Sequence, residues 1–243
     1  MNYSQAVRFV HSRHKFTSRP GLENMKRLTE LCGSPQLGGR FVHVAGTNGK
    51  GSVCEMLSEA FVAAGYRTGL YTSPYIVDFR DRFRINGKMI SRKAFAGLIT
   101  ELKEKIDLLD SQGFAPNEFE IITAAAFLWF KREGCDRVVL EVGLGGRYDS
   151  TNIIEASECS VITHIALDHT SILGDTYALI AAEKSGIIKR GCPVVSYPDQ
   201  PEDAARVISD TAARLLSPLT VPALPQLEMS ALGVRFDYGG EQW

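Results

Sequence analysis

The chain has 243 residues, and 27 Lys and Arg against 28 Asp and Glu leave a formal charge of −1. The chain therefore has no overall positive charge that would favour binding to nucleic acid or to an anionic membrane, and any site for an anion must be local. Five scattered cysteines without a CxxC pair, and no run of 18 apolar residues, predict a cytoplasmic protein outside the membrane.

Short runs rich in Val and Ile predict buried strands of a parallel sheet, and segments of helical periodicity lie between them. In chain order the sequence predicts strand 41–45, a helix from Ser52, strand 67–72, a helix after the N-cap Ser91, helix 118–132, strand 137–142, strand 159–167, helix 177–189, strand 193–197 and helix 202–215. This alternation predicts an α/β fold with a doubly wound, mostly parallel sheet.

Two of these helices show clear apolar faces at the i, i+3, i+4 spacing. The helix from Ser52 carries Val53, Met56, Leu57, Ala60, Phe61 and Ala64. The helix after Ser91 carries Phe95, Leu98, Ile99, Leu102, Ile106 and Leu109. We expect both faces to be buried.

The composition and the periodicity of the sequence change after Leu215. Residues 1–215 are expected to form one domain, whereas 216–243 begin with a proline-rich stretch typical of a linker. The segment then alternates apolar and polar residues up to Gly239-Gly240, a hairpin-turn signal. We interpret 216–243 as a linker and the start of an incomplete hairpin.

A glycine-rich loop joins the first strand to the next helix. It comprises Gly46, Thr47, Asn48, Gly49, Lys50, Gly51 and Ser52. Glycines let backbone N–H groups turn toward a polyphosphate, the helix N-terminus is partly positive, and Lys50 adds a full charge. The sequence therefore predicts a variant P-loop that binds ATP.

This loop and three later segments resemble the Mur ligase superfamily, and in particular its folylpolyglutamate and dihydrofolate synthase branch. The motifs are GTNGKGS, TSPYIVDFRDRFRING at 72–87, LEVGLGGRYDSTN at 140–152 and the residues from His169 to Lys189. The resemblance implies the Mur ligase central-domain fold and an Ω-loop at 73–87. It also implies a further C-terminal glutamate-ligase domain, which we expect to be absent from this chain.

The activity implied is ATP-dependent addition of L-glutamate to a folate, to dihydropteroate or to both, through an acyl phosphate. ATP and two Mg²⁺ ions are the expected cofactors, and a monomer is the expected state. Independently of the resemblance, Glu141 is a carboxylate in an apolar strand, and this position favours a metal ligand. The resemblance adds Ser73, His169 and a carbamylated Lys184 as ligands, and it makes Lys50, His169 and Lys184 the expected catalytic residues.

For the folate itself, the resemblance implies contacts from Ser73, Pro74, Tyr75, Phe119 and Asp149. Tyr75 replaces the family's His, and Phe119 is as consistent with a core position as with an aromatic wall. The alternating arginines Arg80, Arg82 and Arg84 are expected to form a solvated edge, with contact to an anionic glutamate tail as the alternative. His43 is expected to pack within the sheet.

Two other functions compete with this one. A cell-wall amino-acid ligase would carry a nucleotide-sugar domain before the loop, but only about 45 residues precede it here. A nucleotide-binding domain without turnover is the other alternative. The sequence does not decide between a bifunctional and a single-activity ligase.

Overall fold

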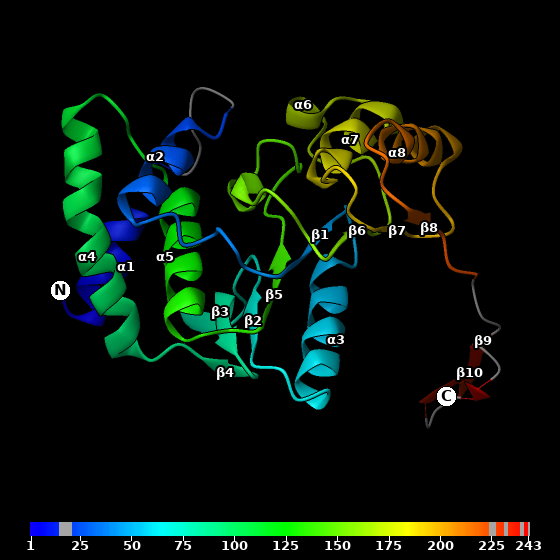
Figure 1. Ribbon diagram of the computed structural model, residues 1–243, viewed down its shortest axis with the longest axis horizontal. Helices are drawn as coiled ribbons and strands as arrows, with labels where there is room; N and C mark the ends of the chain where they lie inside the picture. Colours follow the sequence, from blue (N-terminus) through cyan, green and yellow to red (C-terminus); the bar gives the residue numbers. More distant parts are fainter. Residues whose placement is uncertain (15–20, 224–226, 231–232, 239–240, 243) are drawn as a thin grey trace.

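An eight-stranded sheet runs through the computed structural model, which describes residues 1–14, 21–223, 227–230, 233–238 and 241–242 (Figure 1). The strand order is β4-β3-β2-β5-β1-β6-β7-β8. Neighbours from β2 to β8 pair in parallel, whereas β3 and β4 are antiparallel at one edge. The strands are β1 Phe41–Ala45, β2 Thr68–Tyr71, β3 Phe83–Ile85, β4 Lys88–Met89, β5 Arg137–Glu141, β6 Cys159–Ile162, β7 Val194–Ser196 and β8 Leu219–Thr220.

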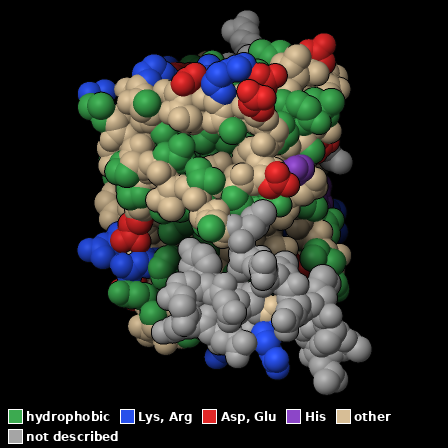
Figure 2. All heavy atoms as spheres, turned by 90° about the vertical axis from the view of Figure 1, so that its right-hand side faces the viewer, with side chains coloured by type: hydrophobic (Ala, Val, Ile, Leu, Met, Phe, Trp, Pro, Cys, Tyr) green, Lys and Arg blue, Asp and Glu red, His purple; other side chains and the backbone are tan. Residues whose placement is uncertain are grey.

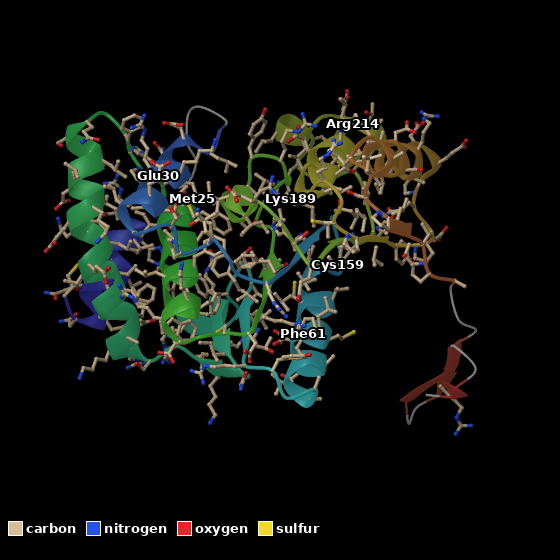
Figure 3. All side chains as sticks on the ribbon, viewed as in Figure 1. Met25, Glu30, Phe61, Cys159, Lys189 and Arg214 are labelled. Carbon is tan, nitrogen blue, oxygen red and sulfur yellow. The ribbon has the colours of Figure 1, made fainter. Side chains whose placement is uncertain are left out.

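Helices cover both faces of this sheet. They are α1 Tyr3–His11, α2 Glu23–Leu31, α3 Lys50–Ala63, α4 Arg92–Ser111, α5 Glu118–Arg132, α6 Thr170–Leu173, α7 Tyr177–Lys184 and α8 Glu202–Arg214. Phe41 of β1 packs with the core of α4 and α5, whereas Val42 and Val44 pack with Cys54 of α3. Figure 3 shows Phe61 on the α3 side and Met25 on the α2 side. The predicted doubly wound, mostly parallel fold is therefore confirmed.

The helices α4 and α5 agree closely with the sequence pattern. Ser91 caps α4 by accepting a hydrogen bond from the N–H of Ala94, and the predicted apolar face of α4 is buried throughout. Helix α5 spans the predicted 118–132. Its N-cap, Asn117, forms a capping box with Glu120, which satisfies backbone N–H groups that a helix start leaves free.

The predicted face of α3 is partly wrong. The fully buried residues of this helix are Cys54 and Ser58, with Val53, Leu57 and Phe61 packed beside them, whereas the Met56 side chain is 70% exposed. The helix also begins earlier, at Lys50, because the glycine loop leads straight into its first turn. The apolar stripe is thus rotated toward small residues that allow α3 to approach the sheet.

Two elements end sooner than the periodicity predicts. Strand β6 stops at Ile162, and the following residues, Thr163 and His164, bond to the glycine loop. Helix α7 stops at Lys184 and continues as the 3-10 turn Ser185–Ile187. There Gly186 lies so close to Arg147 that an added Cβ would be 2.5 Å from the Arg147 Cβ.

Several elements were not predicted. Helices α1 and α2 are short, and each buries only two or three residues along one face. The segment 73–87, expected to be an Ω-loop, contains the 3-10 turn Phe79–Arg82 and strand β3. Strand formation there is possible because β3 pairs with the edge of β2.

Beyond Leu215 the chain still contributes to the sheet. Strand β8 lies within the expected linker and pairs in parallel with β7. A separate antiparallel sheet joins β9 Leu227–Ser230, β10 Gly233–Tyr238 and β11 Glu241–Gln242. The predicted turn at Gly239-Gly240 lies outside the described residues, although β10 and β11 pair on either side of it.

The face of the molecule at the α8 end carries charges of both signs (Figure 2). Figure 2 shows acidic and basic side chains interspersed with apolar ones on the face at the α8 end. Within the described residues, no helix combines the length and the apolar character needed to cross a bilayer.

Candidate nucleotide and metal site

The glycine-rich loop lies between β1 and α3, at the carboxyl edge of the parallel strands. Gly46 and Gly49 have positive φ values of 152° and 82°, and Gly49 caps α3. Lys50 is the first residue of the helix, and its ammonium donates to the carbonyls of Gly46 (3.1 Å) and Thr47 (3.2 Å). The loop thus combines a cation with a helix N-terminus, the arrangement that binds phosphate.

The segment after β6 holds this loop in place. Thr163 Oγ1 donates to the carbonyl of Asn48 (2.8 Å), and the Thr47 N–H donates to the carbonyl of His164 (2.9 Å). A Cβ on Gly46 would lie 1.8 Å from Thr163 Oγ1. Sequence analysis missed Thr163, because its role depends on a contact across more than 110 residues.

A pocket opens beside the loop and brings three predicted catalytic residues together. Lys50, His169 and Lys184 line it, with Asp168 and the glycine segment 142–145. Lys184 is 4% exposed, and its Nζ donates to the carbonyl of Gly46 (2.8 Å). Burial, followed by repulsion from Lys50, lowers the pKa of Lys184 to about 8. The amine is therefore far easier to deprotonate than an ordinary lysine.

His169 occupies the rim of this pocket. It is the N-cap of α6, with a left-handed φ of 50°, and its side chain is 56% exposed. Its Nε2 lies 3.6 Å from Asp168 Oδ2. The imidazole is thus accessible to a ligand from solvent.

Glu141 and Ser73 form a second group near the start of α3. The N–H of Ser73 donates to Glu141 Oε2 (2.9 Å), and an added Cβ on Gly51 would lie 3.8 Å from Glu141 Oε1. Burial raises the pKa of Glu141, while the Ser73 N–H and the charge of Lys50 oppose that rise. A buried carboxylate beside a phosphate loop is a suitable ligand for a hard cation.

The four predicted metal ligands therefore fall into two groups around the loop. Glu141 accepts a hydrogen bond from the backbone N–H of Ser73, while His169 and Lys184 both line the pocket. Among the described residues, no three His, Cys, Asp or Glu side chains gather closely enough to hold a metal by themselves. A metal in this region would need oxygen donors from Ser73, from Lys184 once it carries a carboxylate, or from a phosphate.

The predicted folate residues lie along the same edge. Tyr75 follows the Ser73-Pro74 peptide, is 40% exposed, and its ring centroid lies 5.5 Å from that of Phe79. Phe119 is partly buried and lies 6.0 Å from the ring of Tyr71. Its ring also covers the backbone of Gly143, where an added Cβ would be 2.6 Å from Phe119 Cζ. Phe119 thus contributes to the core and also lies against the pocket-lining segment.

Asp149 is more constrained than the sequence indicated. Its Oδ2 accepts from the N–H groups of Gly143 (3.0 Å) and Leu144 (2.9 Å), and its Oδ1 accepts from the N–H of Thr151 (2.9 Å). The residue is 6% exposed, and burial raises the pKa of its carboxyl group. A bound ring would have to share oxygens that already hold the pocket-lining segment in place.

His43 packs within the sheet, as expected. It is fully buried, and its Nε2 lies 2.8 Å from Thr151 Oγ1, which also bonds to Asp149. Burial lowers the pKa of His43 to about 3, so the ring is neutral at physiological pH.

The prediction that the alternating arginines form a solvated edge is wrong for the central one, Arg82. Arg82 is 8% exposed, whereas its neighbours form ion pairs, Arg80 with Asp78 (2.8 Å) and Arg84 with Glu55. The 3-10 turn Phe79–Arg82 turns the Arg82 side chain inward, a local geometry that strand-like alternation does not predict.

Comparisons with known proteins agree with this arrangement. The scan against family models finds no match. The chain is 45% identical over 218 residues to a dihydrofolate synthase/folylpolyglutamate synthase of Bacillus subtilis, covering 89% of the chain and 50% of that protein. It is 37% identical over 243 residues to a folylpolyglutamate synthase of Lacticaseibacillus casei, covering 98% of the chain and 56% of that protein. The chain belongs to the folylpolyglutamate and dihydrofolate synthase family.

Solved structures of this family have the same fold. The apo form of the L. casei enzyme matches with a TM-score of 0.92 at 36% identity, covering 97% of this chain and 58% of that one. A complex of a folylpolyglutamate synthase with AMPPCP and folate matches with a TM-score of 0.92 at 37% identity, again covering 97% and 58%. The chain thus spans about half the length of the curated relatives it matches.

Proposed function

We propose that this chain supplies the ATP, magnesium and folate sites of an amide ligase that adds L-glutamate to a folate or to dihydropteroate. The observation that carries the proposal is the meeting of Lys50, His169 and Lys184 in one pocket beside a glycine-rich helix start. The solved complex of a relative with AMPPCP and folate supports both ligand classes. The five free thiols support a reducing, cytoplasmic location, and we expect a monomer.

In the proposed reaction the substrate carboxylate attacks the γ-phosphorus of ATP and ADP leaves, giving an acyl phosphate. The amine of glutamate then attacks the acyl carbon, the amide forms, and phosphate and a proton are released. The loop from Gly46 to Ser52 orients the nucleotide, and Lys50 stabilises the charge on its terminal phosphates. Phe119 and the segment Ser73 to Tyr75 bind the folate, and Asp149 contacts it if its loop bonds are shared.

The residues present fit magnesium in part. Glu141 and Ser73 offer a buried carboxylate and a hydroxyl, and His169 offers an accessible imidazole. An ammonium at Lys184 does not fit, but a carbamate would. When bound, magnesium neutralises phosphate charge during transfer. We propose Ser73, Glu141, His169 and carbamylated Lys184 as the ligands of two ions.

A carbamate forms when the neutral amine of Lys184 attacks CO₂ and loses a proton, leaving an anionic oxygen donor. Since the pKa of Lys184 is about 8, the neutral form increases as the pH rises through that value. At constant dissolved ¹³CO₂, the NMR signal of a protein carbamate should therefore grow between pH 7 and pH 9. Lys184→Met should abolish the signal.

Lys189 offers a matched control, because burial lowers its pKa to about 8 as well. Its Nζ donates to the carbonyl of Asn152 (3.2 Å) and does not line the pocket. Lys189→Met should leave the carbamate signal intact. A signal lost with Lys189 and kept without Lys184 would contradict the assignment.

The proposed function is tested by phosphate release in the presence of dihydropteroate or tetrahydrofolate. Release should require ATP, the folate substrate and glutamate together. The second candidate is a nucleotide-binding domain without turnover. Binding of AMPPCP without glutamate-dependent phosphate release would support that candidate. Failure to bind AMPPCP at all would exclude both.

A further inference from the structure

A buried arginine without an acidic partner lies close to the folate segment. Arg82 is 8% exposed, and its Nε has no hydrogen-bond partner. Among the described residues, no carboxylate lies within ion-pair distance of its guanidinium, although Arg80 and Arg84 on either side are both paired. A buried cation is costly unless an anion compensates it. The guanidinium of Arg82 is thus suited to bind an anion.

The backbone of Arg82 is fixed next to the predicted substrate residues. Its carbonyl accepts a hydrogen bond from the N–H of Thr72 (3.2 Å), directly before Ser73. The guanidinium carbon lies 5.3 Å from the ring centroid of Tyr75 and 5.6 Å from that of Phe79. Cation–π contact with these rings holds the side chain in place. It supplies no hydrogen-bond acceptor for the N–H groups of the guanidinium.

The positive charge of Arg82 acts on two neighbouring groups. It opposes the rise in the pKa of Glu141, a proposed metal ligand, and it opposes the rise in the pKa of the buried Tyr71. Tyr71 in turn lies beside Phe119, the proposed aromatic wall. The guanidinium is thus close enough for its charge to act both on Glu141, the proposed magnesium ligand, and on Tyr71, which lies beside the proposed aromatic wall.

We propose that Arg82 binds the carboxylate of the folate-class substrate, the group that the proposed reaction phosphorylates. This inference rests on the proposed function and adds a specific contact to it. A guanidinium presents two parallel N–H donors that match a carboxylate, and the burial of this one strengthens the pair. By holding the carboxylate, Arg82 would place it between the aromatic wall and Glu141.

The test uses two probes that differ only at the acyl group: dihydropteroate, which has a single carboxylate, and its neutral carboxamide. Their dissociation constants are measured calorimetrically with AMPPCP and magnesium present. The wild-type protein should prefer the carboxylate by about 10- to 100-fold, the range for a charge-assisted contact. Arg82→Gln should lose that preference and bind the carboxamide as the wild type does. Arg82→Lys should keep part of the preference.

Arg84→Gln is the matched control, because it breaks an ion pair two residues away and should leave the preference unchanged. Equal weakening of both probes in Arg82→Gln would mean that Arg82 only supports the fold, which would overturn the inference. An unchanged preference in Arg82→Gln would overturn it too. If the wild-type protein binds neither probe, the proposed function itself fails. Far-ultraviolet circular dichroism verifies that the variants are folded.

Discussion

Gly46→Ala should lower the free energy of unfolding by several kcal/mol. The new methyl group would meet Thr163 Oγ1 at 1.8 Å and Thr163 Cβ at 2.9 Å, at a φ of 152° that L-residues rarely adopt. Rotating Thr163 would break its bond to the carbonyl of Asn48, and it would not move the Cβ. Overpacking costs about 1–3 kcal/mol, and the backbone strain adds about 1–2 kcal/mol. Urea unfolding followed by circular dichroism measures the change.

The same loop supplies two graded controls. Gly49→Ala meets no atom within 4 Å but must adopt a φ of 82°, so it should cost only about 1 kcal/mol. Gly51→Ala lies in α3 without a positive φ and makes only ordinary contact with Glu141, so it should be neutral or slightly stabilising. If Gly46→Ala proved no more harmful than Gly49→Ala, the close contact with Thr163 would not exist in solution.

Glu141→Gln should reduce ligase turnover by about 10²- to 10³-fold while making the fold more stable at neutral pH. Burial raises the pKa of Glu141, so its carboxylate weakens the folded state once the pH exceeds the folded pKa. Stability from this group is present below its unfolded pKa and is lost as the pH rises through the folded pKa. The variant should therefore melt at a higher temperature than the wild-type protein at pH 7.5, and the gain should vanish near pH 4.

Magnesium provides the independent readout for this variant. The ion should raise the melting temperature of the wild-type protein in the presence of AMPPCP, and it should do so much less after Glu141→Gln. Glu55→Gln is the control, because Glu55 of α3 is a carboxylate whose charge reaches Glu141 but which pairs with Arg84. It should leave turnover and the magnesium effect unchanged. Full turnover by Glu141→Gln would contradict the metal assignment.

Local patterns predicted much of the fold. Helices α4 and α5 follow their apolar period and their caps, Ser91 and Asn117, almost residue by residue. The strands of the parallel sheet stand out because burial on both faces requires continuous apolar runs. Patterns failed where a neighbour in space competes with periodicity. In α3 small residues face the sheet in place of Met56, and β6 ends where Thr163 turns to the glycine loop.

The sequence by itself predicted the glycine-rich loop between a strand and a helix, the order of the main strands and helices from β1 to α8, and the family, because each depends on residues adjacent in the chain. The tertiary structure decided which side chains meet. Lys50 and Lys184, far apart in sequence, both donate to the carbonyl of Gly46, and burial, followed by repulsion from Lys50, lowers the pKa of Lys184. It also decided that Arg82 is buried without a partner, since burial depends on long-range packing that no short pattern encodes.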